Sequence, residues 1–344
     1  MPPPPKILVI RRRYLGDIVL LGSLFRNLRL HWPEAHLAAL VEAPYAPVLG
    51  LNPDVQSVLT LPQGMLAWPG FIRRLRSEGF SHVIDIDNTE KTALAAWLTG
   101  APARVGLHHA SHPIKLRALY SHVVHEDAAE HEAQPITDYY LKTLGPLGVP
   151  VATRDIALVP REEEVADWRR RRISQSRSLL VHPGSRSPWR IWPAERFAAV
   201  CDRVQDELGA QVILVGGPGD GRLMAEIRAH AKTHLLVLEP APTLTQFAAL
   251  ARACSAFLCH DSGPMHVAAA VGTPVVALYG SQNPVLFRPH GPGHTQLVPE
   301  SPCTACVSPG ACVPADSYHN HCVRLHGVDR VFDAVRATLA RARP

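Results

Sequence analysis

The stretch CHDSGPMHVAAAVGTPVVALYG, residues 259–280, carries the clearest fold signal in the second half of this chain. The run SAFLC that leads into it is typical of a buried strand, and PMHVAAAV predicts a helix with Pro264 in its first turn. Gly272 ends that helix, and PVVALYG predicts another buried strand. Asp261, Ser262 and Gly263 therefore lie where a parallel strand turns into a helix.

This turn has two interpretations. Backbone N–H groups at a helix N-terminus lack partners within the helix, and the helix dipole favours negative charge there. Asp261 or Ser262 could act as an ordinary helix cap. Alternatively, the turn forms a pocket for the phosphates and the sugar of a nucleotide-linked donor. The residues of the turn fit both interpretations.

Strands and helices alternate along both halves of the chain. Short apolar runs such as KILVI (6–10) and SLLVH (178–182) are each followed by an amphipathic helical pattern. Continuous apolar strands separated by helices indicate parallel sheets that are covered on both faces. At 344 residues the chain is long enough for two domains. We expect an N-terminal domain over 1–157, a charged linker over 158–178, a C-terminal domain over 179–325 and a final helix over 326–344.

Composition restricts the class of protein. The chain is 47% hydrophobic and 19% charged, which is typical of a globular protein. Its net charge of +5 suits an anionic ligand or membrane surface but falls short of a nucleic-acid-binding signature. No apolar stretch reaches the length of a membrane span. The N-terminus MPPPPKILVI lacks the layout of a signal peptide, so we expect a cytoplasmic protein.

The cysteines fall into two groups. Cys201, Cys254 and Cys259 lie in apolar helix or strand patterns, where burial is expected. The other four lie in a loop over 303–322 at the spacing C-x2-C-x5-C-x9-C: Cys303, Cys306, Cys312 and Cys322. In a reducing compartment this pattern indicates either a structural zinc site or free, redox-active thiols. His319 and His321 would compete as zinc ligands.

Ligands of open α/β sheets bind beyond the carboxyl ends of the strands. Four loops after predicted strands carry reactive or phosphate-binding residues: RRRYLGDIV (11–19), HPGSRSPWRIWP (182–193), GGPGDG (216–221) and HDSGPMH (260–266). None has the G-x-G-x-x-G spacing of a dinucleotide site, and the chain contains no Walker motif. These absences argue against a hydride-transferring enzyme or a P-loop nucleotidase.

The combination of these segments resembles glycosyltransferase family 9, the ADP-heptose:lipopolysaccharide heptosyltransferases, from Lys6 to about Val335. The matching stretches, in order, are ILVIRRRYLGDIVLLGSLFRNLR, NPDVQSVL, YYLKTLGPLGV, VHPGSRSPWRIWPAERFAAV and LTQFAALARACSAFLCHDSGPMHVAAAVGTPVVALYG. The resemblance implies a GT-B fold, with two Rossmann-like domains whose parallel sheets face across a cleft. The acceptor would bind the N-terminal domain, the nucleotide sugar would bind the C-terminal domain, and the last helix would pack back on the N-terminal domain.

The resemblance also implies an inverting transfer that needs no metal or other cofactor for catalysis. Asp17 would be the general base that takes the proton of the acceptor hydroxyl, although it also fits as a cap for a helix from Ile18. Arg190 would hold the leaving phosphates; alternatively it is a surface arginine over Trp192. The donor site implied in full is Gly184, Ser185, Arg190, Asp220, Asp261, Ser262, Gly263 and His266. His266 fits equally well as a structural histidine.

The expected acceptor side is basic. Its candidate residues, each near the end of a predicted strand, are Arg11, Arg13, Asn88 and Lys91, which could equally be solvated loop residues. The family usually has small residues where this chain has Arg13 and Tyr14, and Asn where it has His260. The resemblance implies ADP-heptose as donor and an anionic lipopolysaccharide inner core as acceptor, at the cytoplasmic face of the inner membrane. Transfer of a different nucleotide-linked sugar, or a non-catalytic GT-B binding protein, are the alternatives.

Overall fold

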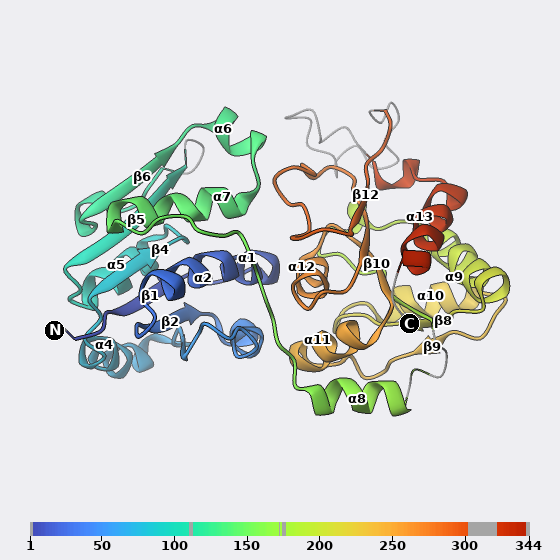
Figure 1. Ribbon diagram of the computed structural model, residues 1–344, viewed down its shortest axis with the longest axis horizontal. Coiled ribbons are helices and arrows are strands. Elements are labelled where there is room, and N and C mark those ends of the chain that lie inside the picture. The colour runs from blue at the N-terminus through green and yellow to red at the C-terminus, as the bar shows by residue number, and fades with distance from the viewer. Residues whose placement is uncertain (1–2, 110–112, 172, 174–176, 302–321, 342–344) are drawn as a thin grey trace. The chain divides into compact units, whose positions relative to one another are not determined.

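Two parallel sheets organise the chain (Figure 1). The computed structural model describes residues 3–109, 113–171, 173, 177–301 and 322–341. The chain divides into two compact units, Met1–Val159 and Pro160–Pro344. Each unit contains a six-stranded sheet in which every hydrogen-bonded pair of strands is parallel. The predicted α/β class with parallel sheets is confirmed.

The first sheet has the strand order β3-β2-β1-β4-β5-β6. Its strands are β1 (Lys6–Ile10), β2 (His36–Val41), β3 (Ser57–Thr60), β4 (His82–Asp85), β5 (Ala103–His109) and β6 (His122–Glu126). The chain moves outward from β1 to β3 and then returns to the other side of β1. The crossovers on the two sides of this switch point lie on opposite faces, which leaves a crevice at the carboxyl ends of β1 and β4.

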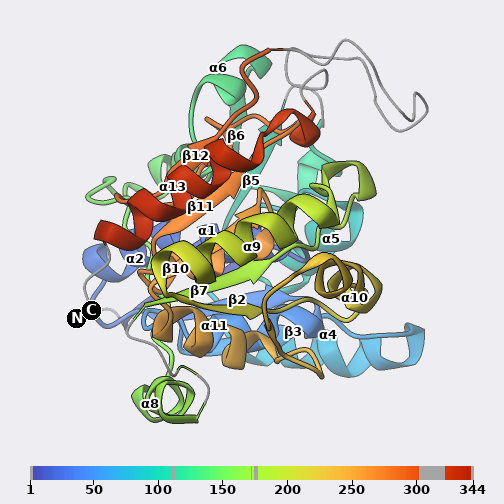
Figure 2. The same cartoon turned by 90° about the vertical axis from the view of Figure 1, so that its right-hand side faces the viewer.

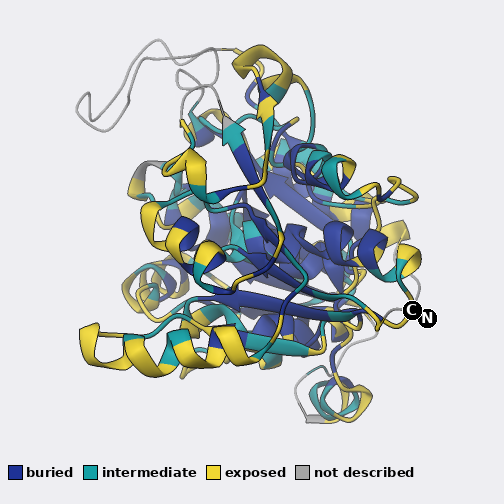
Figure 3. Ribbon diagram, turned by 90° about the vertical axis from the view of Figure 1, so that its left-hand side faces the viewer, coloured by how far each residue is buried: buried dark blue, intermediate teal, exposed yellow. Residues whose placement is uncertain are grey.

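Helices cover both faces of the first sheet. They are α1 (Leu15–Leu20), α2 (Gly22–His31), α3 (Ala46–Leu49), α4 (Trp68–Ser77), α5 (Glu90–Leu98), α6 (Ala128–Ala133) and α7 (Ile136–Leu141), with the 3₁₀-helices η1 (Ala43–Tyr45), η2 (Met65–Ala67), η3 (Arg117–Leu119) and η4 (Lys142–Leu147). Leu8 and Ile10 of β1 face α4 and α5, where Leu75 and Ala93 complete the core. The strands are largely buried, whereas the outer faces of the helices are exposed (Figure 3).

The second sheet repeats this topology in the order β12-β11-β10-β7-β8-β9. Its strands are β7 (Ser178–His182), β8 (Gln211–Leu214), β9 (Leu236–Val237), β10 (Ala256–His260), β11 (Val275–Leu278) and β12 (Thr295–Leu297). The switch point of this unit therefore lies between β7 and β10. The stretch 259–280 runs from the end of β10 through α12 (Gly263–Ala270) into β11, and Gly272 follows the helix with φ +85°.

The other helices of the second unit are α8 (Glu162–Arg171), α9 (Ala194–Leu208), α10 (Gly221–His230), α11 (Leu244–Ala253) and α13 (Val328–Arg341), with the 3₁₀-helices η5 (Pro188–Arg190) and η7 (Val323–Leu325). Helices α13, α9 and α10 lie side by side on one face of the sheet (Figure 2). Helix α8, inside the expected linker, packs on α11. The thiols of Cys201, Cys254 and Cys259 are buried, as predicted.

The apolar face of α13 packs in the second unit, where Val331 and Phe332 are buried in the core against α9. That this helix also packs back on the N-terminal domain stays a prediction. The structure corrects two other expectations. The helix expected from Ile18 begins at Leu15, which places Asp17 in its first turn rather than at its cap. Strands β6 and β12 were not predicted. Both are edge strands, and the sequence HVVHE of β6 has neither a continuous apolar run nor an alternation of apolar and polar residues.

Candidate active site

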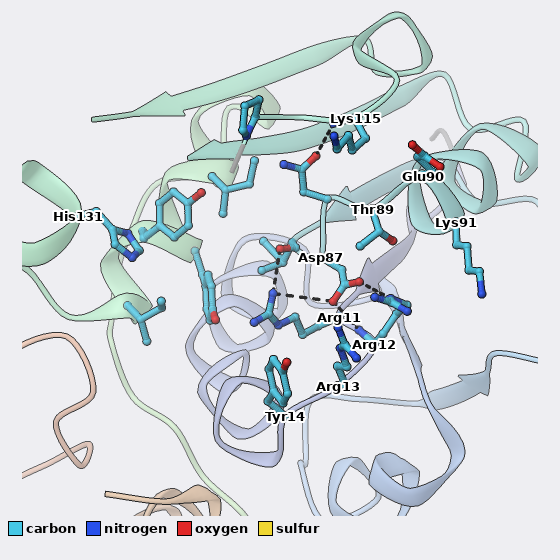
Figure 4. A pocket seen from close by; sticks show the side chains of 17 residues that line it. Arg11, Arg12, Arg13, Tyr14, Asp87, Thr89, Glu90, Lys91, Lys115 and His131 are labelled. Carbon is cyan, nitrogen blue, oxygen red and sulfur yellow. Dashed lines mark hydrogen bonds and ion pairs between the residues drawn. The ribbon is translucent and has the colours of Figure 1, made fainter. Parts of the chain in front are cut away.

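A basic cavity of about 1030 Å³ opens at the switch point of the first unit (Figure 4). It is lined by the residues that follow β1 and β4, together with parts of α5 and α7. Asp87 and Glu90 are its acidic residues, against five cationic ones: Arg11, Arg12, Arg13, Lys91 and Lys115. This excess of positive charge favours an anionic ligand.

Asp17 is not among the residues that line this cavity, but two of the lining residues, Tyr140 and Arg11, hold its carboxylate. The hydroxyl of Tyr140 donates to Oδ1 of Asp17 at 2.7 Å. Arg11 places Nη2 at 3.1 Å from Oδ2 of the same carboxylate. Burial raises the pKa of Tyr140 well above its ordinary value, and the charge of Asp17 raises it further. Tyr140 therefore stays protonated, and its hydroxyl donates a hydrogen bond to the carboxylate of Asp17.

Arg11 is itself positioned by the turn after β4. Its Nη1 lies 3.8 Å from Oδ1 of Asp87 and donates to the carbonyl of Ile86 at 3.3 Å. Asp87 also accepts a hydrogen bond from the guanidinium of Arg12. Figure 4 shows the two arginines converging on Asp87 at the floor of the cavity. Asp17, Arg11 and Asp87 thus form a continuous carboxylate–guanidinium–carboxylate chain.

The buried carboxylate of Asp85 holds the turn after β4 through hydrogen bonds to its backbone. Oδ1 of Asp85 accepts the N–H of Asp87 at 3.0 Å and that of Asn88 at 3.2 Å. Its Oδ2 accepts the hydroxyl of Tyr120 at 2.6 Å. Burial raises the pKa of Asp85 to about 6. Asn88, with φ +51°, adopts a left-handed conformation that Asn tolerates better than most residues.

The second unit carries a cluster at the carboxyl ends of β7 and β10. Nη1 of Arg190 lies 4.0 Å from Oδ2 of Asp261. Neither oxygen of Asp261, nor Nε of Arg190, has a hydrogen-bond partner in the described part of the chain. Burial raises the pKa of Asp261 to about 7 and lowers that of Arg190. Buried polar groups nearly always form hydrogen bonds. The unsatisfied atoms of Arg190 and Asp261 therefore indicate a candidate ligand-binding site.

The turn into α12 leaves its backbone donors uncapped. Ser262 is the N-cap residue, yet no described residue receives or gives a side-chain cap bond there. The Ser262 hydroxyl instead donates back to the carbonyl of His260 at 3.3 Å. The capping interpretation of Asp261 and Ser262 is therefore wrong in this structure. Pro264 has no N–H and the N–H of Met265 donates to the carbonyl of Ser262 at 3.0 Å, so Gly263 supplies the first-turn N–H that could bind an anion.

Gly184 allows two loops of the donor side to meet. A Cβ built at Gly184 would overlap the carboxylate of Asp220, so any larger residue there would require Asp220 or its loop to move. Oδ2 of that carboxylate accepts the N–H of Gly217 at 2.7 Å and lies 3.8 Å from Nε2 of His182. Asp220 thus joins the glycine-rich loop after β8 to the loop after β7.

The remaining donor-side residues differ in their surroundings. His260 accepts the backbone N–H of Trp192 at 2.9 Å, and burial lowers its pKa to about 3, so it is neutral and structural. Trp192 is fully buried and donates its indole N–H to the carbonyl of His326 at 3.0 Å. His266 is buried within α12. The Ser185 hydroxyl accepts the N–H of Ser187 at 3.5 Å.

Residues 68–313 match the model of glycosyltransferase family 9 (heptosyltransferase). The chain belongs to this family. It is 28% identical to lipopolysaccharide heptosyltransferase 2 of Escherichia coli K12 over 304 residues, which cover 83% of this chain and 85% of that protein. It is 26% identical to lipopolysaccharide heptosyltransferase 3 of the same strain over 297 residues, covering 80% and 83%.

Solved structures agree with this assignment. The E. coli ADP-heptose lipopolysaccharide heptosyltransferase II superposes with a TM-score of 0.77 at 25% identity, covering 98% of this chain and 99% of that one. The family 9 glycosyltransferase of Veillonella parvula superposes with a TM-score of 0.84 at 23% identity, covering 98% of each. This likeness confirms the GT-B fold class, and the chain is a glycosyltransferase.

Within this family 9 enzyme, the structure gathers the predicted residues into two groups. Arg11, Arg13, Asn88 and Lys91 line the cavity of the first unit beside Asp17. The donor candidates gather at the carboxyl ends of β7, β8 and β10 in the second unit. Sequence reasoning missed Tyr140, Asp87 and Lys115. Asp87 could have been found, because polar residues directly after an apolar strand mark the carboxyl edge of a parallel sheet.

The cysteine loop, for which a zinc site and free, redox-active thiols are the alternatives, falls largely outside the described residues. Cys303, Cys306 and Cys312 lie outside them, and so do His319 and His321. Among the residues with a described position, no three or more His, Cys, Asp or Glu side chains are grouped to hold a metal ion. In the same residues, no helix is long and apolar enough to span a membrane.

Proposed function

We propose that this enzyme transfers a heptose from ADP-heptose to an acceptor in the inner core of lipopolysaccharide, with inversion, and with Asp17 as general base. The observation that carries the proposal is the double clamp on Asp17. One oxygen accepts from Tyr140 and the other faces Arg11, next to a basic cavity. A carboxylate that is fixed in this way is ready to accept a proton from a bound hydroxyl.

The basic cavity supports an anionic acceptor. Its cationic side chains come from three segments, the residues after β1, the first turn of α5 and the residues after β5, and they line a single cavity. A glycolipid core that carries carboxylates or phosphates would satisfy them, whereas a neutral sugar would leave them unpaired. Arg11 is paired with Asp17 and Asp87, and Arg12 with Asp87 and Glu42. This leaves Arg13, Lys91 and Lys115 as the acceptor-binding cations.

The cluster in the second unit supports a nucleotide-sugar donor. Arg190 and the uncapped first turn of α12 suit the diphosphate, because both favour developing negative charge. The carboxylate of Asp261, which lacks donors in the described residues, suits sugar hydroxyls. Ser185, Gly263 and His266 adjoin these groups in sequence. The similarity to the E. coli ADP-heptose lipopolysaccharide heptosyltransferase II supports adenine as the base and heptose as the sugar.

In the proposed step, the acceptor oxygen attacks the anomeric carbon of the donor from the side opposite the leaving group. Asp17 takes the hydroxyl proton as the new carbon–oxygen bond forms. The old carbon–oxygen bond breaks, and its electron pair leaves with ADP. Arg190 and the N–H of Gly263 at the start of α12 stabilise the added charge on the diphosphate. No metal has a role in this assignment.

Transfer assays test this proposal. The purified enzyme is given ADP-heptose, UDP-glucose or GDP-mannose with heptose-deficient lipopolysaccharide, in the presence of a chelator. Selective heptose transfer that survives chelation is the expected result. Transfer from another donor would overturn the heptose assignment and keep the glycosyltransferase. Nucleotide binding without transfer from any donor would indicate a non-catalytic binding protein, and loss of transfer on chelation would contradict the metal-independent mechanism.

A further inference from the structure

The first unit exposes large apolar side chains beside its basic cavity. In η2, Met65 is 88% exposed and Leu66 is 99% exposed. Leu94 and Trp97 of α5 are 43% and 47% exposed. Exposed apolar side chains are informative when they gather near one another rather than when they are scattered singly. We call these four residues of η2 and α5 the apolar face.

The apolar face belongs to one continuous layer. Helices α4 and α5 pack against each other on the same face of the sheet, and η2 leads directly into α4 (Figure 1). Nε of Arg76 donates to the carbonyl of Leu98 at 3.3 Å, which fixes the end of α4 beside the end of α5. Met65 and Leu66 therefore lie on the same layer as Leu94 and Trp97.

Positive charge accompanies this apolar face. Residues 62–77 contain Arg73, Arg74 and Arg76 and no acidic residue. All three arginines are exposed on α4. Arg74 forms only a distant pair with Glu78, at 3.8 Å. An exposed apolar surface flanked by arginines is the combination that binds the interface of an anionic bilayer.

The apolar face also reaches the rim of the cavity. Lys91, Leu94 and Trp97 are spaced three residues apart on α5, so they form one stripe along the exposed side of that helix. Lys91 lines the cavity. Because all strands are parallel, α4 and α5 both begin at the carboxyl edge of the sheet, where the cavity opens. Met65 and Leu66 precede α4 at this same edge.

We infer that the apolar face and the arginines of α4 dock this enzyme on an anionic phospholipid bilayer. Met65, Leu66, Leu94 and Trp97 would enter the interface, and the arginines would contact lipid headgroups. A lipid-borne acceptor would then rise from the bilayer next to the cavity rim at Lys91. The docking surface is independent of the donor chemistry, since it requires neither nucleotide nor acceptor.

Co-sedimentation of the full chain with lipid vesicles tests this inference. Vesicles of phosphatidylglycerol and phosphatidylethanolamine are compared with vesicles of phosphatidylcholine, without nucleotide or acceptor. We expect binding to the anionic vesicles only. Each arginine near an anionic surface strengthens binding about fivefold, so Arg73→Gln/Arg74→Gln should bind roughly 25-fold more weakly. Met65→Ser/Leu66→Ser should bind about tenfold more weakly because less apolar area is buried.

Matched variants separate this surface from general effects of charge and hydrophobicity. Arg222→Gln removes an exposed arginine of α10, and Val159→Ser/Leu325→Ser removes two exposed apolar side chains elsewhere. Both controls should bind vesicles as the wild type does. Equal loss in controls and test variants, or no binding of the wild type to anionic vesicles, would overturn the inference. Either result would leave the proposed sugar transfer untouched, because that reaction is measured with a detergent-dispersed acceptor.

Discussion

Tyr140 donates its hydroxyl hydrogen to Oδ1 of Asp17 at 2.7 Å, across 123 residues of sequence. The phenol lines the basic cavity, and Asp17 contacts the cavity lining through it. Together with Arg11 on the other oxygen, Tyr140 fixes the plane of the carboxylate. We regard Tyr140 and Arg11 as positioning residues for the proposed base.

Replacement of Tyr140 by Phe removes this hydrogen bond and keeps the ring. The carboxylate of Asp17 should then rotate more freely, and kcat should fall about tenfold while the Kd for ADP stays unchanged. Steady-state kinetics and calorimetry measure the two quantities. Tyr45→Phe, in η1 and away from the cavity lining, is the matched control and should behave as the wild type. Equal kcat in both variants would contradict a positioning role.

Arg190→Ala should weaken binding of ADP by about 10- to 100-fold, which is the range for loss of a charge-assisted contact to phosphate. Calorimetric titration with ADP measures this effect directly. Arg222→Ala removes an arginine whose side chain is 93% exposed at the start of α10, and should leave the Kd unchanged. If both variants bind ADP like the wild type, the diphosphate does not bind at Arg190.

Asp261→Asn should stabilise the free protein at high pH and weaken donor binding. Burial raises the pKa of Asp261 to about 7, above its unfolded value of 3.8, so the folded state binds the extra proton between these values. The wild type consequently loses stability as the pH rises from about 4 to about 7, by up to about 4 kcal/mol. The Asn variant lacks this loss.

Urea denaturation at pH 5 and pH 8 checks the prediction for Asp261. The difference in unfolding free energy between Asp261→Asn and the wild type should be larger at pH 8 than at pH 5. ADP-heptose binding should weaken in the variant more than ADP binding does, because the sugar hydroxyls lose their acceptor. A pH-independent difference in stability would show that Asp261 does not titrate in this range.

Gly184→Ala should destabilise the second unit. The added Cβ would overlap the carboxylate of Asp220, which also holds the N–H of Gly217. Relief of this overlap requires movement of Asp220 or of the loop, at a cost of about 1–3 kcal/mol in unfolding free energy. Gly219→Ala, in the glycine-rich loop after β8 and with no atom within 4 Å of its Cβ, is the control for thermal denaturation. Similar melting temperatures for the two variants would argue against close contact.

Much of the fold could be predicted because its strands are apolar and its helices are amphipathic. KILVI has four fully buried residues in β1, and PMHVAAAV became α12 with its stop at Gly272. The hydrophobic periodicity did not predict the edge strands β6 and β12. In β6 the order His-Val-Val-His-Glu shows no alternation of apolar and polar residues, and β12 has only three residues.

The site residues could be predicted only where a polar or charged side chain follows directly after an apolar strand. Arg11 and Asn88 follow β1 and β4 closely, and Asp261 comes directly after β10. Tyr140 carries no such signal, since its contact with Asp17 arises from the packing of α7 against the first helices. Whether a side chain caps α12 could be decided only from the structure. Ser and Asp at such a turn can act either as a helix cap or as part of a ligand site.

The role of Asp17 as the base is best measured by single-turnover heptose transfer with Asp17→Asn, alongside calorimetric binding of ADP to the same variant. A general base contributes about 100- to 10,000-fold to the rate, so we predict a loss of this size with an unchanged Kd for ADP. Turnover within a few-fold of the wild type would contradict the assignment of Asp17 as the base.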